Sequence, residues 1–302
     1  MLAQSSSKKA GLAFSNSNSN FSKPIASHFS DYSLKITELD FNTSAQEYVS
    51  CMYQNRLVVV SSRKVQTAKD KTSLLDQSEY KLLSFKKVNN SWVQPYLLAG
   101  VFTGKENHAG LTFSADETRV YYTKSSRHNP DVYQLFTAEK SSKHSSVWVN
   151  SKAIAITSTI YSIENPHLTS DGNTLYFSSD MPGGYGGYDL YKAQVLKTGK
   201  LGNIVNLGPK INTSSDENFP GITENKSQLF FASNTRGGFG GFDLYQAFMQ
   251  GADYSKPLNL GEGINSKYDE FALFTQDGTN GYFSSNKNSL SKKMNIYSFA
   301  KQ

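Results

Sequence analysis

The residues with the clearest capacity for chemistry are glutamates that recur at one place in a repeated segment. Glu47, Glu164, Glu217 and Glu270 each fall five or six residues ahead of a predicted hairpin turn, and His108 takes that place in a further copy. If the following strands line one channel, these carboxyl groups converge at its mouth. Glycoside hydrolysis needs two carboxyl groups about 5–9 Å apart, and a ring of oxygens also suits Ca²⁺.

The regularity of these acids weighs against catalysis. A catalytic pair needs two different environments so that the two pKa values diverge. The same residue on every unit indicates instead a repeated structural role, such as bonding a neighbouring backbone. We therefore predict that the chain is not an enzyme and has no catalytic residue, no metal and no cofactor. Glycoside hydrolysis by these channel acids is the alternative hypothesis.

Two glycine-rich loops stand out next, GGYGGY at residues 183–188 and GGFGGF at residues 237–242. Their glycines do not fit the GxGxxG phosphate-binding pattern, and no Lys-Ser/Thr pair or helix start follows them. Glycine permits the positive φ angles of a compact loop. Asp189 and Asp243 follow directly, and we expect their carboxylates to accept hydrogen bonds from the loop amides.

The aromatic residues of these loops are candidates for binding a partner. Adjacent aromatic and arginine side chains have the composition of interface anchors. We expect the loop-tip residues to be exposed and the residues next to the strand to pack, although packing between units would also explain all of the aromatics. The candidate set is Tyr185, Tyr188, Arg236, Phe239 and Phe242.

The loops belong to a longer duplication, since residues 174–193 and 228–247 are nearly the same phrase. Fainter copies predict five units of four short strands, which form a β-propeller when repeated radially. The fold class is therefore all-β, with five blades; six would need a blade hidden in residues 61–80 or 136–160. The last unit lacks its outer strand, and the segment at residues 32–36 is predicted to complete it and close the ring. Residues 1–30 are predicted to be a disordered or extended tail, and residues 31–302 a single propeller domain.

Charge and composition exclude other classes of partner. The formal net charge is +6, but the lysines are spread through loops and tail, and no nucleic-acid recognition motif accompanies them. We predict no nucleic-acid binding. No apolar run is long enough for a transmembrane segment, and the five histidines form no zinc spacing.

The repeated string, a turn followed by LYFSS and GGYGGYDLY, resembles the WD-like propeller repeats of TolB-type cell-envelope proteins. It is most similar to the subgroup with GGxGGxDLY loops, found in outer-membrane-associated proteins and in periplasmic parts of the type IX secretion and gliding machinery. The resemblance covers residues 100–300 well. It implies a periplasmic scaffold that binds a protein of an outer-membrane secretion or assembly complex. An OmpA-like domain, common in that family, is missing here, so binding to the cell wall is not implied.

Overall fold

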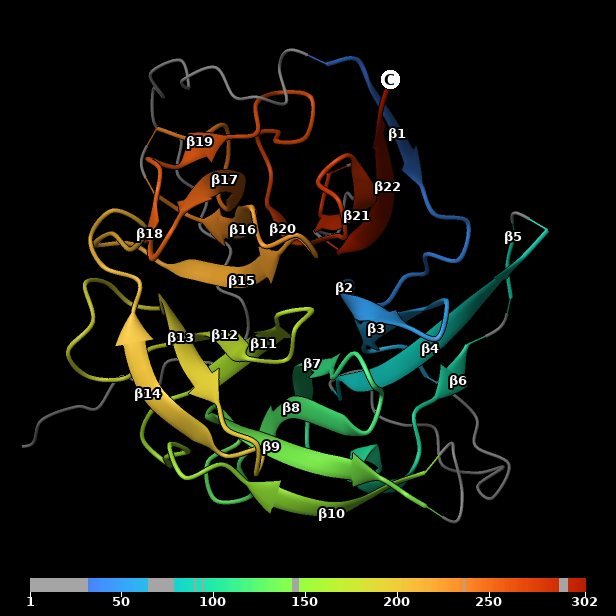
Figure 1. Cartoon of the computed structure of the whole chain (residues 1–302). Coiled ribbons are helices and arrows are strands. Elements are labelled where there is room, and N and C mark those ends of the chain that lie inside the picture. Colours follow the sequence, from blue (N-terminus) through green and yellow to red (C-terminus); the bar gives the residue numbers. More distant parts are fainter. Residues whose placement is uncertain are drawn as a thin grey trace, which may run out of the picture.

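The computed structural model describes residues 32–302, except for 65–78, 90, 94, 143–146, 236 and 288–292. Five antiparallel sheets of four or five strands are arranged around a common axis (Figure 1), and in the described residues the only helix is a single 3₁₀ turn at Gly100–Phe102. The prediction of an all-β propeller with five blades is confirmed. The predicted tail at residues 1–30 lies outside the described residues.

Each blade is one sheet whose first strand lies innermost. Blade 1 contains β2 (Glu47–Tyr53), β3 (Arg56–Ser61), β4 (Lys81–Val88), β5 (Ser91–Trp92) and β6 (Tyr96–Leu97). Blade 2 contains β7 (His108–Phe113), β8 (Arg119–Ser125), β9 (Tyr133–Lys140) and β10 (Trp148–Ala153). Blade 3 contains β11 (Ile163–Leu168), β12 (Thr174–Ser179), β13 (Asp189–Val195) and β14 (Leu201–Asn206). Blade 4 contains β15 (Glu217–Ile222), β16 (Gln228–Ser233), β17 (Asp243–Gln250), β18 (Asp253–Tyr254) and β19 (Leu258–Asn259). Blade 5 contains β20 (Glu270–Thr275), β21 (Asn280–Ser285), β22 (Asn295–Lys301) and β1 (Leu34–Glu38).

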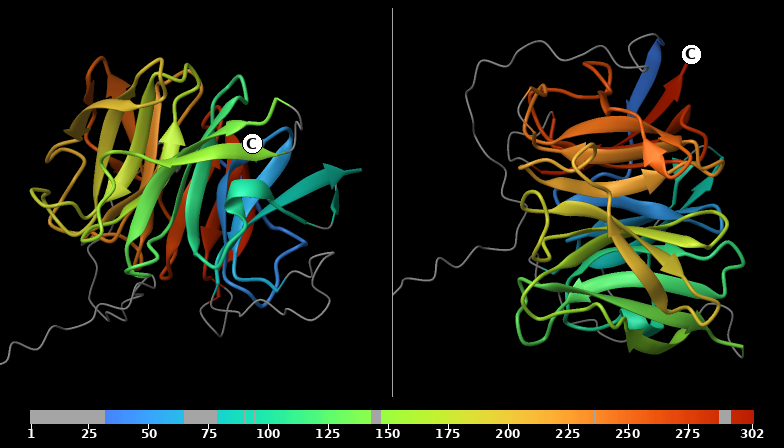
Figure 2. Two further views of the ribbon diagram at one scale, coloured as in Figure 1. Left: turned by 90° about the horizontal axis from the view of Figure 1, so that it is seen from below. Right: turned by 60° about the vertical axis from the view of Figure 1, so that its left-hand side comes forward.

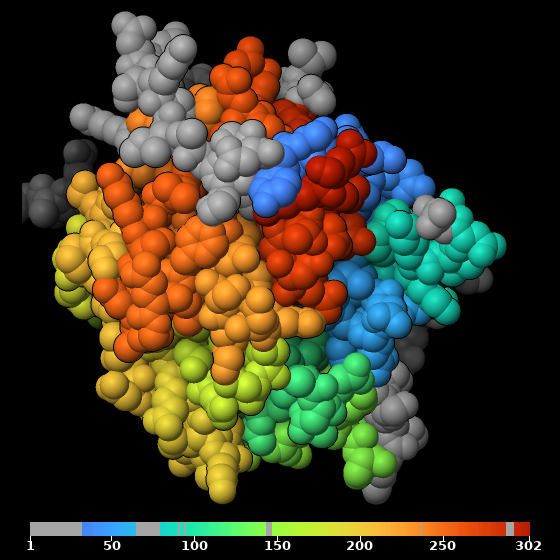
Figure 3. All heavy atoms as spheres, turned by 45° about the horizontal axis from the view of Figure 1, so that its top comes forward, coloured from blue at the N-terminus to red at the C-terminus, as the bar shows by residue number. Residues whose placement is uncertain are grey.

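The strand β1 closes the ring. It pairs with β22 in antiparallel register, from Leu34 opposite Lys301 to Glu38 opposite Tyr297. The Leu39 amide then donates a hydrogen bond of 3.0 Å to the carbonyl of Ile296. Figure 3 shows the N-terminal strand lying beside the C-terminal one. The prediction that an N-terminal strand completes the fifth blade is therefore confirmed.

Apolar and aromatic side chains fill the spaces between blades, whose sheets pack face to face (Figure 2). The second and third strands of three blades present the same stacked pair of rings: Phe177 on Tyr191, Phe231 on Tyr245 and Phe283 on Tyr297, with centroids 5.5–5.8 Å apart. Aromatic side chains bury a large area per residue between sheets. This repeated pair explains how a chain with 37% hydrophobic residues fills five interfaces.

The innermost strands β2, β7, β11, β15 and β20 all carry a bulge in their pairing with the second strand. At three of these bulges a residue takes a positive φ, 50° at Asn165, 55° at Phe219 and 52° at Ala272. A bulge bends its strand and redirects the side chains that follow it. The bulges therefore decide which side chains face the axis of the ring.

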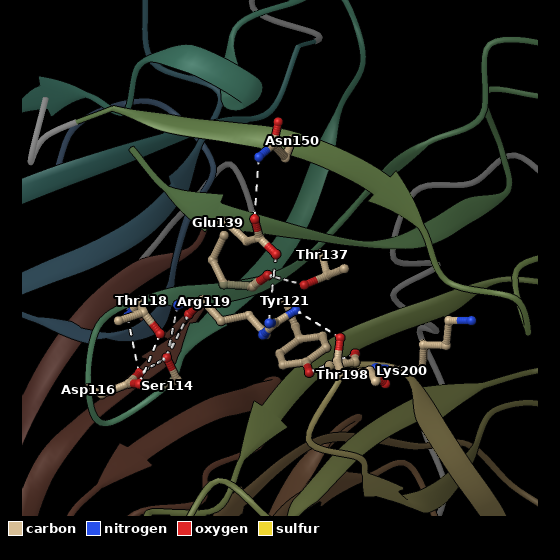
Figure 4. A network of polar contacts seen from close by, with 12 residues as sticks. Ser114, Asp116, Thr118, Arg119, Tyr121, Thr137, Glu139, Asn150, Thr198 and Lys200 are labelled. Carbon is tan, nitrogen blue, oxygen red and sulfur yellow. Dashed lines mark hydrogen bonds and ion pairs between the residues drawn. The ribbon is translucent and has the colours of Figure 1, made fainter. Parts of the chain in front are cut away.

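Polar contacts join blades 2 and 3 at the ends of the strands opposite the glycine loops (Figure 4). Tyr121 donates a hydrogen bond of 3.0 Å to the carbonyl of Gly199, and Arg119 lies 3.7 Å from the carboxylate of Glu139. Ser114, Asp116 and Thr118 bond one another within the first hairpin turn of blade 2. The bond of Tyr121, together with that of Arg119 to the carbonyl of Thr198 at 3.5 Å, fixes the outer turn of blade 3 on blade 2.

No helix in the part of the chain that the structure describes is long and apolar enough to cross a membrane.

Candidate functional site

The two glycine-rich loops, which we call the twin loops (residues 183–188 and 237–242), connect the second and third strands of blades 3 and 4. Asp189 accepts hydrogen bonds from the amides of Tyr185 and Gly186, at 2.6 and 3.2 Å. Asp243 repeats these contacts with Phe239 and Gly240, also at 2.6 and 3.2 Å. The prediction that each aspartate binds the amides of its own loop is confirmed.

The middle glycines of the twin loops press against the segment that enters the next blade. A Cβ atom on Gly186 would lie 2.0 Å from the carbonyl oxygen of Ser215, and one on Gly240 would lie 2.0 Å from that of Tyr268. The following amides of Gly187 and Gly241 donate to the same two carbonyls, at 3.3 and 3.0 Å. Only glycine fits at this distance. The motif therefore joins consecutive blades, which the sequence pattern did not indicate.

The loop aromatics divide into two groups. Tyr185 is 51% exposed at the tip of its loop, whereas Phe242, next to the strand, is 7% exposed. Tyr188 and Phe239 are half-buried. Arg236, the fifth member of the candidate set, lies outside the described residues. The twin loops thus present one clearly exposed ring, and their role in binding stays a prediction.

Three of the four channel acids are held inside their own blades. Glu47, Glu217 and Glu270 are fully buried. The carboxylate of Glu217 accepts hydrogen bonds from the amide and hydroxyl of Thr213, at 2.8 and 2.7 Å, and from the hydroxyl of Ser233, at 2.7 Å. Each of these acids therefore stabilises the loop that precedes it.

The other two buried acids use the same contacts. Glu270 accepts bonds from the Ser266 amide and hydroxyl, both at 2.7 Å, and from the Ser285 hydroxyl at 2.6 Å. Burial raises the pKa of Glu270 to about 7, against the lowering effect of these hydrogen bonds. Glu47 differs in having a cation, since Arg63 Nη2 lies 2.8 Å from its Oε1.

Glu164 does not belong to this set. It pairs in register with Ser178, whereas Glu217 pairs with Ser233, the equivalent of Ser179. Neighbouring residues of a strand point to opposite sides, so Glu164 occupies the position of Asn218 instead. The number of residues between each glutamate and its hairpin turn does not reveal this one-residue shift in strand register. The four acids are not equivalent, and Glu164 alone is half-buried rather than fully buried.

Glu164 lies among tyrosines from three blades. The hydroxyl of Tyr188 donates a hydrogen bond of 2.7 Å to its Oε1. Tyr48 and Tyr133 lie close enough for the Glu164 charge to contribute to their raised pKa values, behind the larger effect of burial. Tyr80 packs on Tyr48 with ring centroids 6.4 Å apart. We call Glu164, Tyr48, Tyr80, Tyr133 and Tyr188 the tyrosine cage.

Burial raises the pKa of Glu164 to about 7, with the nearby charge of Asp180 adding to the rise and the Tyr188 hydrogen bond opposing it. A carboxyl group poised near neutrality can hold or release a proton under physiological conditions. The cage could not be predicted from the sequence, because its tyrosines belong to different blades that only the closed ring brings together.

At the centre of the ring the innermost strands enclose a small cavity. The cavity there has a volume of about 30 Å³ and is lined by the innermost strands of all five blades. This volume suits roughly one water molecule. On one side His167 contacts the backbone of Ile222 through Nε2, at 3.1 Å. This central cavity is therefore too small for a sugar ring.

The predicted ring of acids does not form a metal site. Among the residues that the structure describes, no group of three or more His, Cys, Asp or Glu side chains is placed to hold a metal ion. The buried glutamates bond serines, threonines and Arg63 of their own blades. The buried glutamates therefore do not converge on a common cation.

Comparisons with known proteins give fold-level likenesses. No family model matches the chain, and no curated protein matches it. The catalytic domain of the Coprinopsis cinerea GH62 α-L-arabinofuranosidase matches with a TM-score of 0.52 and 8% identity, over 90% of this chain and 97% of that one. A B. megaterium levansucrase mutant matches with a TM-score of 0.51 and 13% identity, over 92% and 88%. A putative TolB from Agrobacterium tumefaciens matches with a TM-score of 0.45 and 13% identity, over 74% and 67%.

The two likenesses with a TM-score above 0.5 show the propeller fold alone. The resemblance to TolB-type repeats, with its GGxGGxDLY subgroup, stays a prediction from the sequence. The same two likenesses also correct one inference. The prediction that the chain is not an enzyme is wrong. It was inferred from the regular repetition of the acids, but the same propeller fold occurs in an arabinofuranosidase catalytic domain and in a levansucrase. Blade regularity leaves room for one irregular residue, and Glu164 is such a residue.

Proposed function

We propose that the protein is a periplasmic binding subunit of a cell-envelope complex and that it recognises a protein partner with the face that carries the twin loops. The observation that carries this proposal is Tyr185, a large ring 51% exposed on a loop that is fixed by Asp189 and by the next blade. The resemblance to TolB-type repeats favours an outer-membrane secretion or assembly complex, with type IX secretion as the finer proposal.

The rigidity of the loop is what makes the exposed ring useful. An anchor that is already held in its bound position loses little conformational entropy when a partner covers it. Tyrosine is among the residues that contribute most at interface centres. The half-buried Phe239 repeats the position on the neighbouring blade. Two fixed anchors on adjacent blades suit a folded protein surface better than a small molecule.

The test is site-specific photo-crosslinking in membrane fractions. A photoreactive residue at position 185 is expected to form one dominant adduct, whose partner is identified by mass spectrometry. The control is the same residue at position 196, since Leu196 is 41% exposed on the opposite face of the same blade. Equal adducts from both positions, or adducts from position 196 alone, would overturn the assignment of the binding face.

A second candidate is carbohydrate hydrolysis, and the specific observation in its favour is Glu164. A carboxyl group with a pKa of about 7 suits a general acid. The nearby Asp180 is the other carboxyl group of this region. The test is release of reducing sugar from arabino- and fructo-oligosaccharides. Activity that Glu164→Gln abolishes and Glu217→Gln spares would favour this candidate, because Glu217 is sealed within its own blade.

A further inference from the structure

The tyrosine cage has a property that the proposed function does not use. Its single carboxyl group has no cation beside it in the described part of the chain, where Glu164 forms no ion pair with any lysine, arginine or histidine. Burial is the main cause of the raised pKa of its carboxyl group, and no positive charge lowers it. Glu47, by contrast, is paired with Arg63.

The walls of the cage are aromatic and incompletely bonded. Tyr48 is 7% exposed, and its hydroxyl has no hydrogen-bond partner among the described residues. The hydroxyls of Tyr80 and Tyr133 also have none there, although both side chains are half-buried. Tyrosine faces attract cations through the ring quadrupole, most strongly where water is excluded. None of these hydroxyl oxygens is among the buried unsatisfied atoms of the described residues. A tyrosine hydroxyl that is not already bonded can accept a hydrogen bond from a ligand that has donors.

We infer that the tyrosine cage binds a cationic side chain, lysine or arginine, of the protein partner, with Glu164 as its counter-ion and the tyrosines as its walls. The inference deepens the proposed function and rests on it for the source of the cation. Tyr188 links the two, because it belongs to the first twin loop and reaches Glu164 with its hydroxyl. A partner docked on the twin loops would thus place a side chain over the channel mouth.

Charge favours a cation over other ligands. An anion would meet an unpaired carboxylate, and a neutral sugar would leave that charge uncompensated. An ammonium or guanidinium group supplies the missing charge and donates to tyrosine hydroxyls and to Glu164.

The test measures binding of small probes to the full chain by NMR chemical-shift titration. The probe is Nα-acetyl-lysine methylamide, and its neutral counterpart carries an acetyl group on Nε as well. We expect the charged probe to bind at least about tenfold more tightly, since charge-assisted hydrogen bonds dominate such a site. Equal binding of the two probes, or tighter binding of a neutral arabino-oligosaccharide, would overturn the inference.

The pH dependence of probe binding can be measured on the wild-type chain. The groups facing Glu164 are Tyr48 from β2, Tyr80 ahead of β4, Tyr133 from β9, and Asp180 and Tyr188 from the loop between β12 and β13. The tyrosines stay neutral, because their pKa values are raised above 10. The ionised fraction of Glu164 should rise about tenfold between pH 6 and pH 8. Affinity for the charged probe should rise with it.

Matched variants separate the cage from the rest of the ring. Glu164→Gln should weaken the charged probe about tenfold and abolish the pH dependence, while Glu217→Gln, which removes one carboxylate inside blade 4, should leave both unchanged. Equal loss in both variants would contradict the cage. If the probe binds as expected but photo-crosslinking at position 185 finds no partner, the inference about the cage is supported and the proposed binding face is wrong. If crosslinking finds a partner but the probe does not bind, only the inference about the cage is wrong.

Discussion

The hydroxyl of Tyr188 donates a hydrogen bond of 2.7 Å to Oε1 of Glu164. This contact joins a glycine-rich loop to the half-buried carboxyl group of the tyrosine cage. It opposes the effect of burial on the pKa of Glu164, which lies at about 7. The first twin loop and the tyrosine cage are therefore joined through Tyr188.

Removal of this hydrogen bond should raise the pKa of Glu164 further. Tyr188→Phe keeps the ring and deletes the donor, so we expect a rise of about one unit, the size of a hydrogen bond to a charged group. The measurement is a carboxyl ¹³C titration by NMR. Tyr185→Phe is the control, because Tyr185 contacts Glu164 in no described interaction. An unchanged pKa in Tyr188→Phe would show that the hydrogen bond has little energetic weight.

The raised pKa of Glu164 should make folding depend on pH. A carboxyl group whose pKa is higher in the folded state contributes stability that is fully present below its unfolded pKa and is lost as the pH rises through about 7. Wild type should therefore lose roughly 1–3 kcal/mol relative to Glu164→Gln between pH 5 and pH 8. Denaturant unfolding at both pH values measures this difference, and parallel pH profiles for the two proteins would contradict it.

The glycine contact between blades can be tested by adding one methyl group. Gly186→Ala would place a Cβ 2.0 Å from the carbonyl oxygen of Ser215, so we expect a loss of about 2 kcal/mol or more. Gly202→Ala is the matched control, because its Cβ would lie 3.4 Å from flexible side chains. Its effect should stay within about 0.5 kcal/mol. Similar melting temperatures for both variants would mean that blades 3 and 4 are joined by other contacts.

Truncation tests the closing strand. Removal of residues 1–28 should leave the melting temperature unchanged, whereas removal of residues 1–40 deletes the pairing of β1 with β22. The exposed edge of β22 should then promote aggregation, and we expect the melting temperature to fall by about 5 °C or more. Calorimetry and light scattering measure both effects. Identical behaviour of the two truncated proteins would contradict the role of β1.

The sequence predicted the fold well because the repeat carries the information locally. Strand runs and turns recur in each unit, and the aspartate-bonded loops recur in two of them, so five blades and the closing strand could be predicted from the pattern. The contact of Gly186 with Ser215 was not visible, because it depends on how one blade approaches the next. Glycine in such a loop is explained equally well by positive φ.

The site was harder to predict because it depends on register. Glu164 and Glu217 look equivalent when counted from their turns, but β11 pairs Glu164 with Ser178 and β15 pairs Glu217 with Ser233. A shift of one residue moves a side chain to the other side of a strand. Tyr48 and Tyr133 carry no motif, and only ring closure brings them near Glu164.

The most direct measurement of the central claim is the affinity of the purified chain for the partner identified by crosslinking. Tyr185→Ala should weaken binding by about 2 kcal/mol, roughly thirtyfold, because a buried aromatic anchor is lost. Tyr96→Ala is the matched control, a tyrosine 64% exposed on the outer edge of blade 1. We predict that it binds like wild type. Equal affinities for wild type and Tyr185→Ala, with both folded, would contradict the claim that the twin loops form the binding face.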